Sequence, residues 1–374
     1  FYRELYPMQF EEPLFNIHLN VDYPFNLTGI LYFPKINNDI NIQKDRIQLY
    51  QNQVFVTDNV EGIVPEFLTL LRGVIDSPDI PLNVSRSYLQ ADGAVKKISN
   101  YITRKVADKL NSLFKKDRKG FEEKWNDIKV VIEYGMLSED KFYDKADNFA
   151  LYPTTDGEYF TFDELKENIK DQQTDKDDKL VILYASEVDS QHSYIKQAKD
   201  KGYKVLLLDS PIIGHLIQKM EGSKDKISFA RVDGDTLENL IKKDETVISK
   251  ISDKEKEKLK PIIEDVVKEG GYTVQLEPLD SKSLPFVLTQ PEFMRRMKEM
   301  QQTGGGGMMG NMPDMYNLVV NTNHELVSQI LNTKTKKKKE SLIQQALDLA
   351  KLSQNLLKGE ALTQFIQRSV DLIK

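Results

Sequence analysis

Apolar and polar residues follow two different periods along the first 116 residues. Three stretches have the length and the alternating or continuous apolar character of β-strands: residues 15–21, 27–33 and 47–56. Residues 65–71 are compatible with a short helix, and apolar residues then recur at every third or fourth position from Val95 to Phe114. That spacing places one apolar stripe along a long amphipathic helix. Strands followed by helices predict an α/β sandwich over residues 1–116.

A charged segment follows, and after it strands and helices alternate. Residues 117–178 are charged and mostly helical in character, which predicts a helical connector. Three apolar runs in the next segment have the length of buried strands, with helical spacing between them: residues 180–184, 203–208 and 227–230. A small doubly wound α/β unit is therefore expected over residues 179–250.

Small α/β units of this kind often hold nucleotides at the carboxyl ends of their strands. Here the turn after the first strand reads ASEVDSQ and has no glycine that would let the backbone approach a pyrophosphate. The polar candidates at the strand ends are Glu187, Asp189 and Asp209, which form no known motif. The sequence favours a structural role for the unit. A small-molecule enzyme that uses residues 179–231 stays open as an alternative.

Residues 255–374 form the last predicted domain, in which helices and short strands precede a helical hairpin interrupted at Gly359. The apolar stripes of the two hairpin helices are wider than one packed neighbour needs. Two such hairpins, one from each of two copies, would cover both stripes. The predicted interface residues are Ile343, Leu347, Leu357, Leu362, Phe365, Ile366 and Ile373. We therefore expect a carboxy-terminal dimerisation domain and a homodimer.

Seven of the ten methionines lie between Met294 and Met315. Pro291 suits the first turn of a helix, on which one apolar face would lie opposite Arg295, Arg296 and Lys298. The residues of that face are Phe293, Met294, Met297 and Met300. Flexible, polarizable methionines suit a surface that accepts many apolar partners, which predicts a binding site for unfolded proteins. The alternative, a stripe packed inside its own domain, stays open.

Composition narrows the class of protein. A chain of 374 residues that is 40% hydrophobic and 29% charged can bury a core and should divide into two or three domains. A net charge of −6 argues against a nucleic-acid partner. The absence of cysteine removes disulfides and thiolate chemistry, and the four scattered histidines suggest no metal site. No apolar run has the roughly twenty residues of a membrane span. We expect a cytoplasmic protein without a membrane partner.

The most informative motif spans residues 73–90 and reads GVIDSPDIPLNVSRSYLQ. Ser85 is a good helix N-cap, so Arg86 and Gln90, four residues apart, should share one helix face. The planar guanidinium of an arginine held this way suits phosphate oxygens, and a glutamine one turn later can orient it. The residue types alone leave open an ordinary surface arginine in a loop salt bridge.

The full string closely resembles the signature of the middle domain of the heat shock protein 90 chaperones, called high-temperature protein G in bacteria, and departs from it only by Ile80 for leucine. The resemblance extends to FYRELYP at residues 1–7 and to the VFVTD and VPEFL stretches. In the family, the corresponding arginine and glutamine reach the γ-phosphate of ATP. The resemblance therefore implies catalytic roles for Arg86 and Gln90, with Asn83 shaping the loop.

The nucleotide pocket of the family has no match here, so the chain resembles only the middle and carboxy-terminal domains. Residues 1–116 and 179–250 would be the large and small α/β parts of the middle domain. The resemblance implies no cofactor in this fragment, with ATP and Mg²⁺ bound by the full-length parent. It also implies three partners: a second copy, unfolded or partly folded client proteins, and the parent's own amino-terminal ATPase domain. The fragment alone should be inactive. A passive dimerising scaffold is a further alternative.

Overall fold

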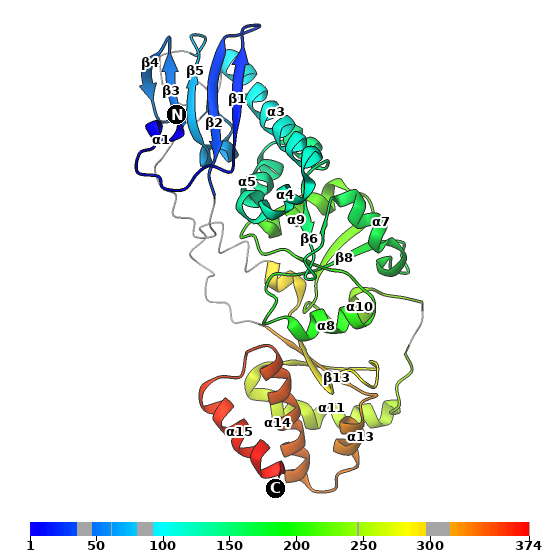
Figure 1. Ribbon diagram of the computed structural model, residues 1–374. Helices are drawn as coiled ribbons and strands as arrows, with labels where there is room; N and C mark the ends of the chain where they lie inside the picture. Colours follow the sequence, from blue (N-terminus) through cyan, green and yellow to red (C-terminus); the bar gives the residue numbers. More distant parts are fainter. Residues whose placement is uncertain (36–46, 61, 81–92, 245–246, 297–314, 374) are drawn as a thin grey trace. The chain divides into compact units, whose positions relative to one another are not determined.

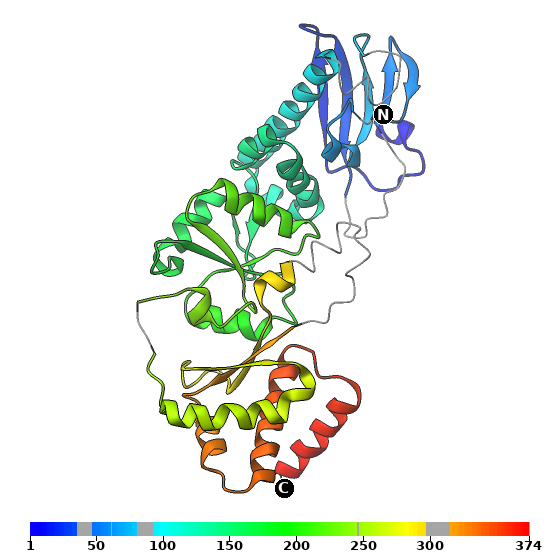
Figure 2. The same ribbon diagram turned by 180° about the vertical axis from the view of Figure 1, so that it is seen from behind.

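The structure is a computed structural model, and it describes residues 1–35, 47–60, 62–80, 93–244, 247–296 and 315–373. The chain divides into two compact units (Figures 1 and 2). Unit 1 comprises Phe1–Tyr152 and Tyr159–Glu164, and unit 2 comprises Pro153–Glu158 and Leu165–Lys374. Among the described residues, no helix combines the length and apolar character needed to cross a membrane. The finer four-part division expected from the sequence stays a prediction.

Unit 1 contains a five-stranded sheet in the order β1-β2-β5-β3-β4. Its strands are β1 (Phe15–Val21), β2 (Leu27–Phe33), β3 (Ile47–Gln51), β4 (Val54–Thr57) and β5 (Arg72–Asp76). All neighbours are antiparallel except β3 and β5. Gly73 has φ +146°, and a Cβ there would lie 2.1 Å from the carbonyl oxygen of Ile30. Only glycine fits at this close approach of two strands.

One predicted strand differs from the structure. Residues 47–56 form the two strands β3 and β4, joined by a tight turn at Asn52 and Gln53, which have φ of 50° and 68°. The left-handed conformation lets the chain reverse within two residues, as in the tightest β-hairpins. The apolar pattern continues across the turn and does not reveal it.

Helices complete unit 1, and the predicted stripe from Val95 to Phe114 lies on the longest of them. The helices are α1 (Tyr2–Leu5), η1 (Glu66–Leu70), α3 (Gly93–Lys116), α4 (Arg118–Glu123), α5 (Trp125–Ser138) and α6 (Asp140–Ala146). Two short strands follow, β6 (Tyr152–Pro153) and β7 (Tyr159–Phe160), and β6 ends at the first residue of unit 2. On α3 the residues Val95, Ile98 and Leu110 are fully buried. In the core, Phe67 and Phe142 pack with ring centroids 4.8 Å apart.

Unit 2 begins with the predicted α/β part, a parallel sheet in the order β10-β8-β9. Its elements are β8 (Leu180–Ala185), α8 (His192–Asp200), β9 (Val205–Leu207), α9 (Ile213–Ser223), β10 (Ile227–Arg231) and α10 (Leu237–Leu240), preceded by α7 (Phe162–Gln173). Every residue of the central strand β8 is buried. A fully apolar strand of this kind is expected at the centre of a parallel sheet.

The rest of unit 2 is a mixed sheet covered by helices. Its elements are α11 (Asp253–Val267), η2 (Lys268–Gly270), β11 (Thr273–Glu277), β12 (Phe286–Thr289), β13 (Asn317–Asn321), α13 (Glu325–Asn332), α14 (Lys336–Ser353) and α15 (Gly359–Ile373). The sheet order is β11-β13-β12. Leu259 of α11, Leu288 of β12 and Ile343 of α14 meet in one apolar cluster. The α/β class predicted from the sequence is confirmed.

Candidate functional site

The three predicted catalytic residues, Asn83, Arg86 and Gln90, lie outside the described residues. The structure does describe the base of their loop, residues 73–80, of which 73–76 belong to β5 and 77–80 continue directly from it. On the far side of the loop, the chain is described again from Gly93, where α3 begins.

Hydrogen bonds tie this base to the neighbouring turns. The buried Ser77 donates its hydroxyl to the carbonyl of Asn26 at 2.6 Å, and its backbone N–H donates to Tyr50 at 3.1 Å. The backbone N–H of Asn26 donates in turn to the carboxylate of Asp79 at 2.6 Å. The side chain of Gln51 donates to the carbonyls of two loop residues, at 3.1 Å and 3.3 Å. The loop therefore leaves the sheet from a fixed point.

A second set of contacts joins the start of the chain to β5. The hydroxyl of Tyr6 accepts from the backbone N–H of Gly73 at 2.7 Å, and it lies 3.2 Å from the carbonyl oxygen of the same residue. The guanidinium of Arg72 donates to the hydroxyl of Tyr2 at 2.7 Å. Two of the stretches that carried the family resemblance, FYRELYP and the start of the 73–90 motif, are thus in direct contact. The sequence pattern did not predict the contact, although the two tyrosines stand inside a recognised motif.

The predicted client-binding residues are described only in part. Phe293 is 74% exposed and Met294 is partly exposed, whereas Met297 and Met300 lie outside the described residues. The neighbouring arginines point inward. Arg295 is buried and donates to the hydroxyl of Tyr184 at 2.6 Å, and Arg296 pairs with Glu221 at 2.8 Å. The periodicity of the sequence predicted an apolar face and a charged face on this segment. It did not predict that the charged face packs against the rest of unit 2.

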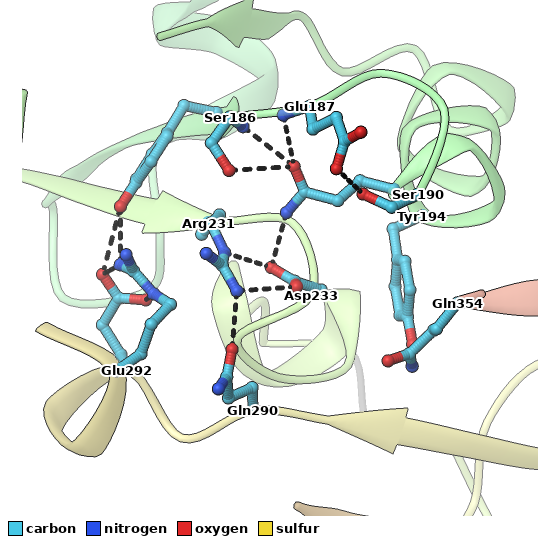
Figure 3. Close-up of polar contacts among 12 residues, drawn as sticks. Ser186, Glu187, Ser190, Tyr194, Arg231, Asp233, Gln290, Glu292 and Gln354 are labelled. Atoms are coloured by element: carbon cyan, nitrogen blue, oxygen red, sulfur yellow. Dashed lines mark hydrogen bonds and ion pairs between the residues drawn. The ribbon is translucent and has the colours of Figure 1, made fainter. Parts of the chain in front are cut away.

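Figure 3 shows a polar network at the carboxyl ends of β8 and β10. Arg231 pairs with Asp233 through two bonds of 2.6 Å and 2.9 Å and also donates to the side chain of Gln290 at 2.8 Å. Gln191 donates to Asp233 at 2.9 Å, and its oxygen accepts from the backbone N–H of Glu187 at 3.0 Å. The position where a doubly wound fold usually binds a ligand therefore holds side chains of the chain itself.

Two tyrosines belong to the same region. Burial, followed by the charge of Glu292, raises the pKa of Tyr184. Burial, followed by the charge of Asp233, raises the pKa of Tyr194, whose hydroxyl contacts the carbonyl of Leu288 and the side chain of Gln354. Both phenols therefore stay protonated at neutral pH and serve as hydrogen-bonding groups.

The predicted dimer residues fall into two groups. Ile343, Leu347, Leu357 and Phe365 are buried within unit 2, Leu362 is partly buried, and Ile366 is exposed. The side chain of Ile373 is not described. Among the side chains that the structure describes, the large apolar ones that remain exposed on α14, α15 and their connection, here called the hairpin face, are Leu349, Leu352, Leu356, Ile366 and Val370.

A buried polar contact fixes the two hairpin helices against each other. Asp348 of α14, whose side chain is only 4% exposed, pairs with Arg368 of α15 and also accepts from Gln344 at 2.9 Å. Gln345 donates to the hydroxyl of Ser369 at 3.0 Å. A buried carboxylate needs such partners, so the pair defines the register of the hairpin.

The structure thus defines an α/β protein of two compact units, in which the described start of the 73–90 motif is hydrogen-bonded to neighbouring turns of the unit 1 sheet. A family model described as Hsp90 protein matches residues 1–363. The chain therefore belongs to the Hsp90 protein family.

Individual relatives agree with this family. The chaperone protein htpG of Bacteroides fragilis (strain YCH46) is 46% identical over an alignment of 441 residues, which covers 100% of this chain and 65% of that protein. The chaperone protein HtpG of Porphyromonas gingivalis (strain ATCC 33277) is 51% identical over 356 residues, covering 94% of this chain and 52% of that protein. The chain thus spans less than two thirds of the length of these relatives.

Proposed function

We propose that this chain is the middle and carboxy-terminal part of a cytoplasmic Hsp90-type chaperone, and that it completes the ATPase site of an amino-terminal domain through Arg86. The observation that carries the proposal is the anchored base of the 73–90 loop. Ser77, Asp79 and Gln51 hold that base against two turns of the sheet. An arginine that stabilises charge on a transferred phosphate must be delivered with fixed geometry, and a tethered loop base meets that need.

Nucleotide and Mg²⁺ would bind in the amino-terminal domain of the parent, and ATP would be its substrate. This chain would contribute the guanidinium of Arg86, with Gln90 orienting it and Asn83 shaping the loop. The fragment alone would therefore bind ATP weakly and turn over none. A tight, stoichiometric ATP complex of the isolated chain in calorimetry would contradict this division of labour.

The test of the Arg86 role uses the full-length parent. Arg86→Ala should lower ATP turnover on the order of 10³-fold, as for comparable arginines at phosphoryl-transfer sites, with little change in nucleotide affinity. Arg86→Lys should not restore turnover, because a point charge cannot replace the planar fork. Arg104→Ala, which removes an exposed arginine from α3, is the matched control and should leave turnover unchanged. Normal turnover in Arg86→Ala would refute the assignment.

Client binding is the second element of the proposal, and the exposed Phe293 supports it. Phe293 is a large aromatic side chain that is 74% exposed, and it stands beside the partly exposed Met294 at the start of the methionine-rich segment. Phe293→Glu with Met294→Glu should therefore weaken suppression of aggregation of an unfolded protein, with almost no change in melting temperature. Ile248→Glu, at an exposed apolar position outside this segment, is the control. A large fall in melting temperature would instead indicate that the two side chains pack inside.

The alternatives have less support. A small-molecule enzyme would need free space at the ends of β8 and β10, where Arg231, Asp233 and Gln290 bond to one another. A passive scaffold would need neither the anchored loop base nor the role proposed for Arg86.

A further inference from the structure

The segment 290–296, here called the Phe293 segment, continues from the end of β12 and is bonded to the small α/β part of unit 2. The backbone N–H of Gln290 donates to the carbonyl of Asp233 at 2.9 Å, and its side chain accepts from Arg231 at 2.8 Å. The backbone N–H of Arg295 donates to Pro291 at 3.1 Å, which closes one helical turn. The amino-terminal end of the segment is therefore fixed at the strand ends (Figure 3).

Arg295 supplies the central anchor. Its side chain is only 5% exposed, and it donates to the hydroxyl of Tyr184 at 2.6 Å and pairs with Glu292. The guanidinium carbon lies 5.8 Å from the centre of the Tyr184 ring. A buried arginine is tolerated only when its donors and its charge are matched, and this one meets both conditions.

Arg296 extends the anchoring to a helix and a strand that are distant in sequence. Its two terminal nitrogens donate to the carboxylate of Glu221 at 2.8 Å and 3.3 Å, and one of them also donates to the carbonyl of Phe229 at 3.0 Å. Glu221 accepts in turn from the backbone N–H of Phe229 at 2.7 Å. The planar guanidinium of Arg296 therefore faces the carboxylate of Glu221, which a backbone N–H of β10 holds in place.

These contacts determine which way the Phe293 segment faces. Within one helical turn, Glu292, Arg295 and Arg296 take the inward positions, and Phe293 is left 74% exposed. The usual arrangement has the charged face in solvent and the apolar face inside. Here Tyr184 and Glu221 accept hydrogen bonds from the two inward arginines. If the segment rotated to bury Phe293, the arginines would lose these hydrogen bonds.

We propose that Glu221 and Arg296 form a latch that fixes the orientation of the Phe293 segment and thereby positions Phe293 and Met294 against an unfolded polypeptide. The positioning role rests on the proposed client binding, whereas the latch itself is a property of the free chain. Glu221 and Arg296 are positioning residues and need not touch the client.

The latch is tested first by hydrogen exchange in the whole chain. Glu221→Gln keeps an oxygen for the Phe229 N–H and removes the charge that holds Arg296. Protection of the Arg295 amide should fall at least about tenfold, because hydrogen bonds to a charged partner are lost. Glu238→Gln is the matched control, since it breaks a 2.6 Å ion pair with Lys201 of similar exposure elsewhere in unit 2. Arg296→Lys should give a smaller loss of protection than Arg296→Gln.

The positioning role is tested by aggregation suppression with the same variants and with Phe293→Ser. Measured well below the melting temperatures of both variants, Glu221→Gln should raise the concentration needed for half-maximal suppression and Glu238→Gln should not. Unchanged protection of the Arg295 amide in both Glu221→Gln and Arg296→Gln would overturn the latch. Suppose that Glu221→Gln loses protection of the Arg295 amide but suppresses aggregation normally, whereas Phe293→Ser impairs suppression. The latch then has no positioning role, and the proposed client binding is retained. Normal suppression by Phe293→Ser would refute the client surface and the positioning role together.

Discussion

The hairpin face gives the sharpest quantitative prediction, because its contribution to dimerisation can be worked out from exposure. Its five side chains are 40% to 52% exposed in one copy. Fully burying a side chain of this kind contributes roughly 1.5–3 kcal/mol, so burying the remaining half contributes roughly 0.7–1.5 kcal/mol. Ten such side chains from two copies would contribute roughly 7–15 kcal/mol. Association costs about 4–15 kcal/mol at a 1 M standard state, and a dimer at micromolar concentration needs a net gain of about 8 kcal/mol. The expected dimer therefore requires burial near the upper end of this range together with a low cost of association.

Two buried charges on each copy should abolish the dimer. Leu352→Glu with Ile366→Glu places carboxylates where the partner hairpin would lie, and an unpaired buried charge costs several kcal/mol. In sedimentation equilibrium at micromolar concentration, the native chain should have twice 43.1 kDa and the double variant 43.1 kDa. Ile248→Glu removes an apolar side chain that is 84% exposed outside the hairpin, and it should leave the dimer intact. A double variant that still sediments as a dimer would refute this face as the interface.

Two further perturbations test unit 1. Gln51→Ala removes both hydrogen bonds to the 73–80 loop base, so it should lower the free energy of unfolding by about 0.5–1.5 kcal/mol and slow ATP turnover in the parent. If stability falls as expected and turnover stays normal, the hydrogen bonds of Gln51 do not serve catalysis. A hydrogen bond from Arg118 lowers the pKa of Glu164 to about 2, although partial burial opposes the shift. The pair therefore stabilises the fold above the ordinary carboxyl pKa and stops doing so as pH falls toward 2. Both side chains are over a third exposed, so Arg118→Ala should cost no more than about 1 kcal/mol at pH 7, and its unfolding free energy should converge with that of the native chain in acid.

Local patterns were sufficient where a single element decides the outcome. The stripe on α3 is buried where the three- and four-residue spacing placed it, and the fully apolar run of β8 is the central strand of its sheet. The hairpin helices are separated close to the expected point, although α14 ends at Ser353 and Gly359 is itself the first residue of α15. In these elements the spacing of apolar residues matches the repeat of the helix or strand, so the sequence alone is sufficient to predict the element and its buried face.

Patterns were insufficient where the burying partner comes from elsewhere in the chain. Ile343 and Leu347 lie on a stripe that looked like an intermolecular surface, yet they pack against Leu288 and Leu259 of the same unit. The width of the stripe indicated more apolar surface than a hairpin can cover. It could not show which of these residues pack in the domain core and which remain available for a second copy. The exposed remainder, with Leu352 and Ile366, became identifiable only from the tertiary packing.

The Phe293 segment illustrates the same limit through charge. Periodicity separates the arginines from the apolar residues whichever face turns inward, because a helical wheel has no reference to the rest of the fold. What decides the direction is a carboxylate 75 residues earlier, Glu221, whose own position depends on the backbone of β10. Without Glu221 the partly buried Arg296 would lose its charge partner on the rest of the fold, and the inward position of the charged face would lose that support. The exposure of Phe293, the proposed client surface, is therefore supported by charge pairing on the opposite face of the segment.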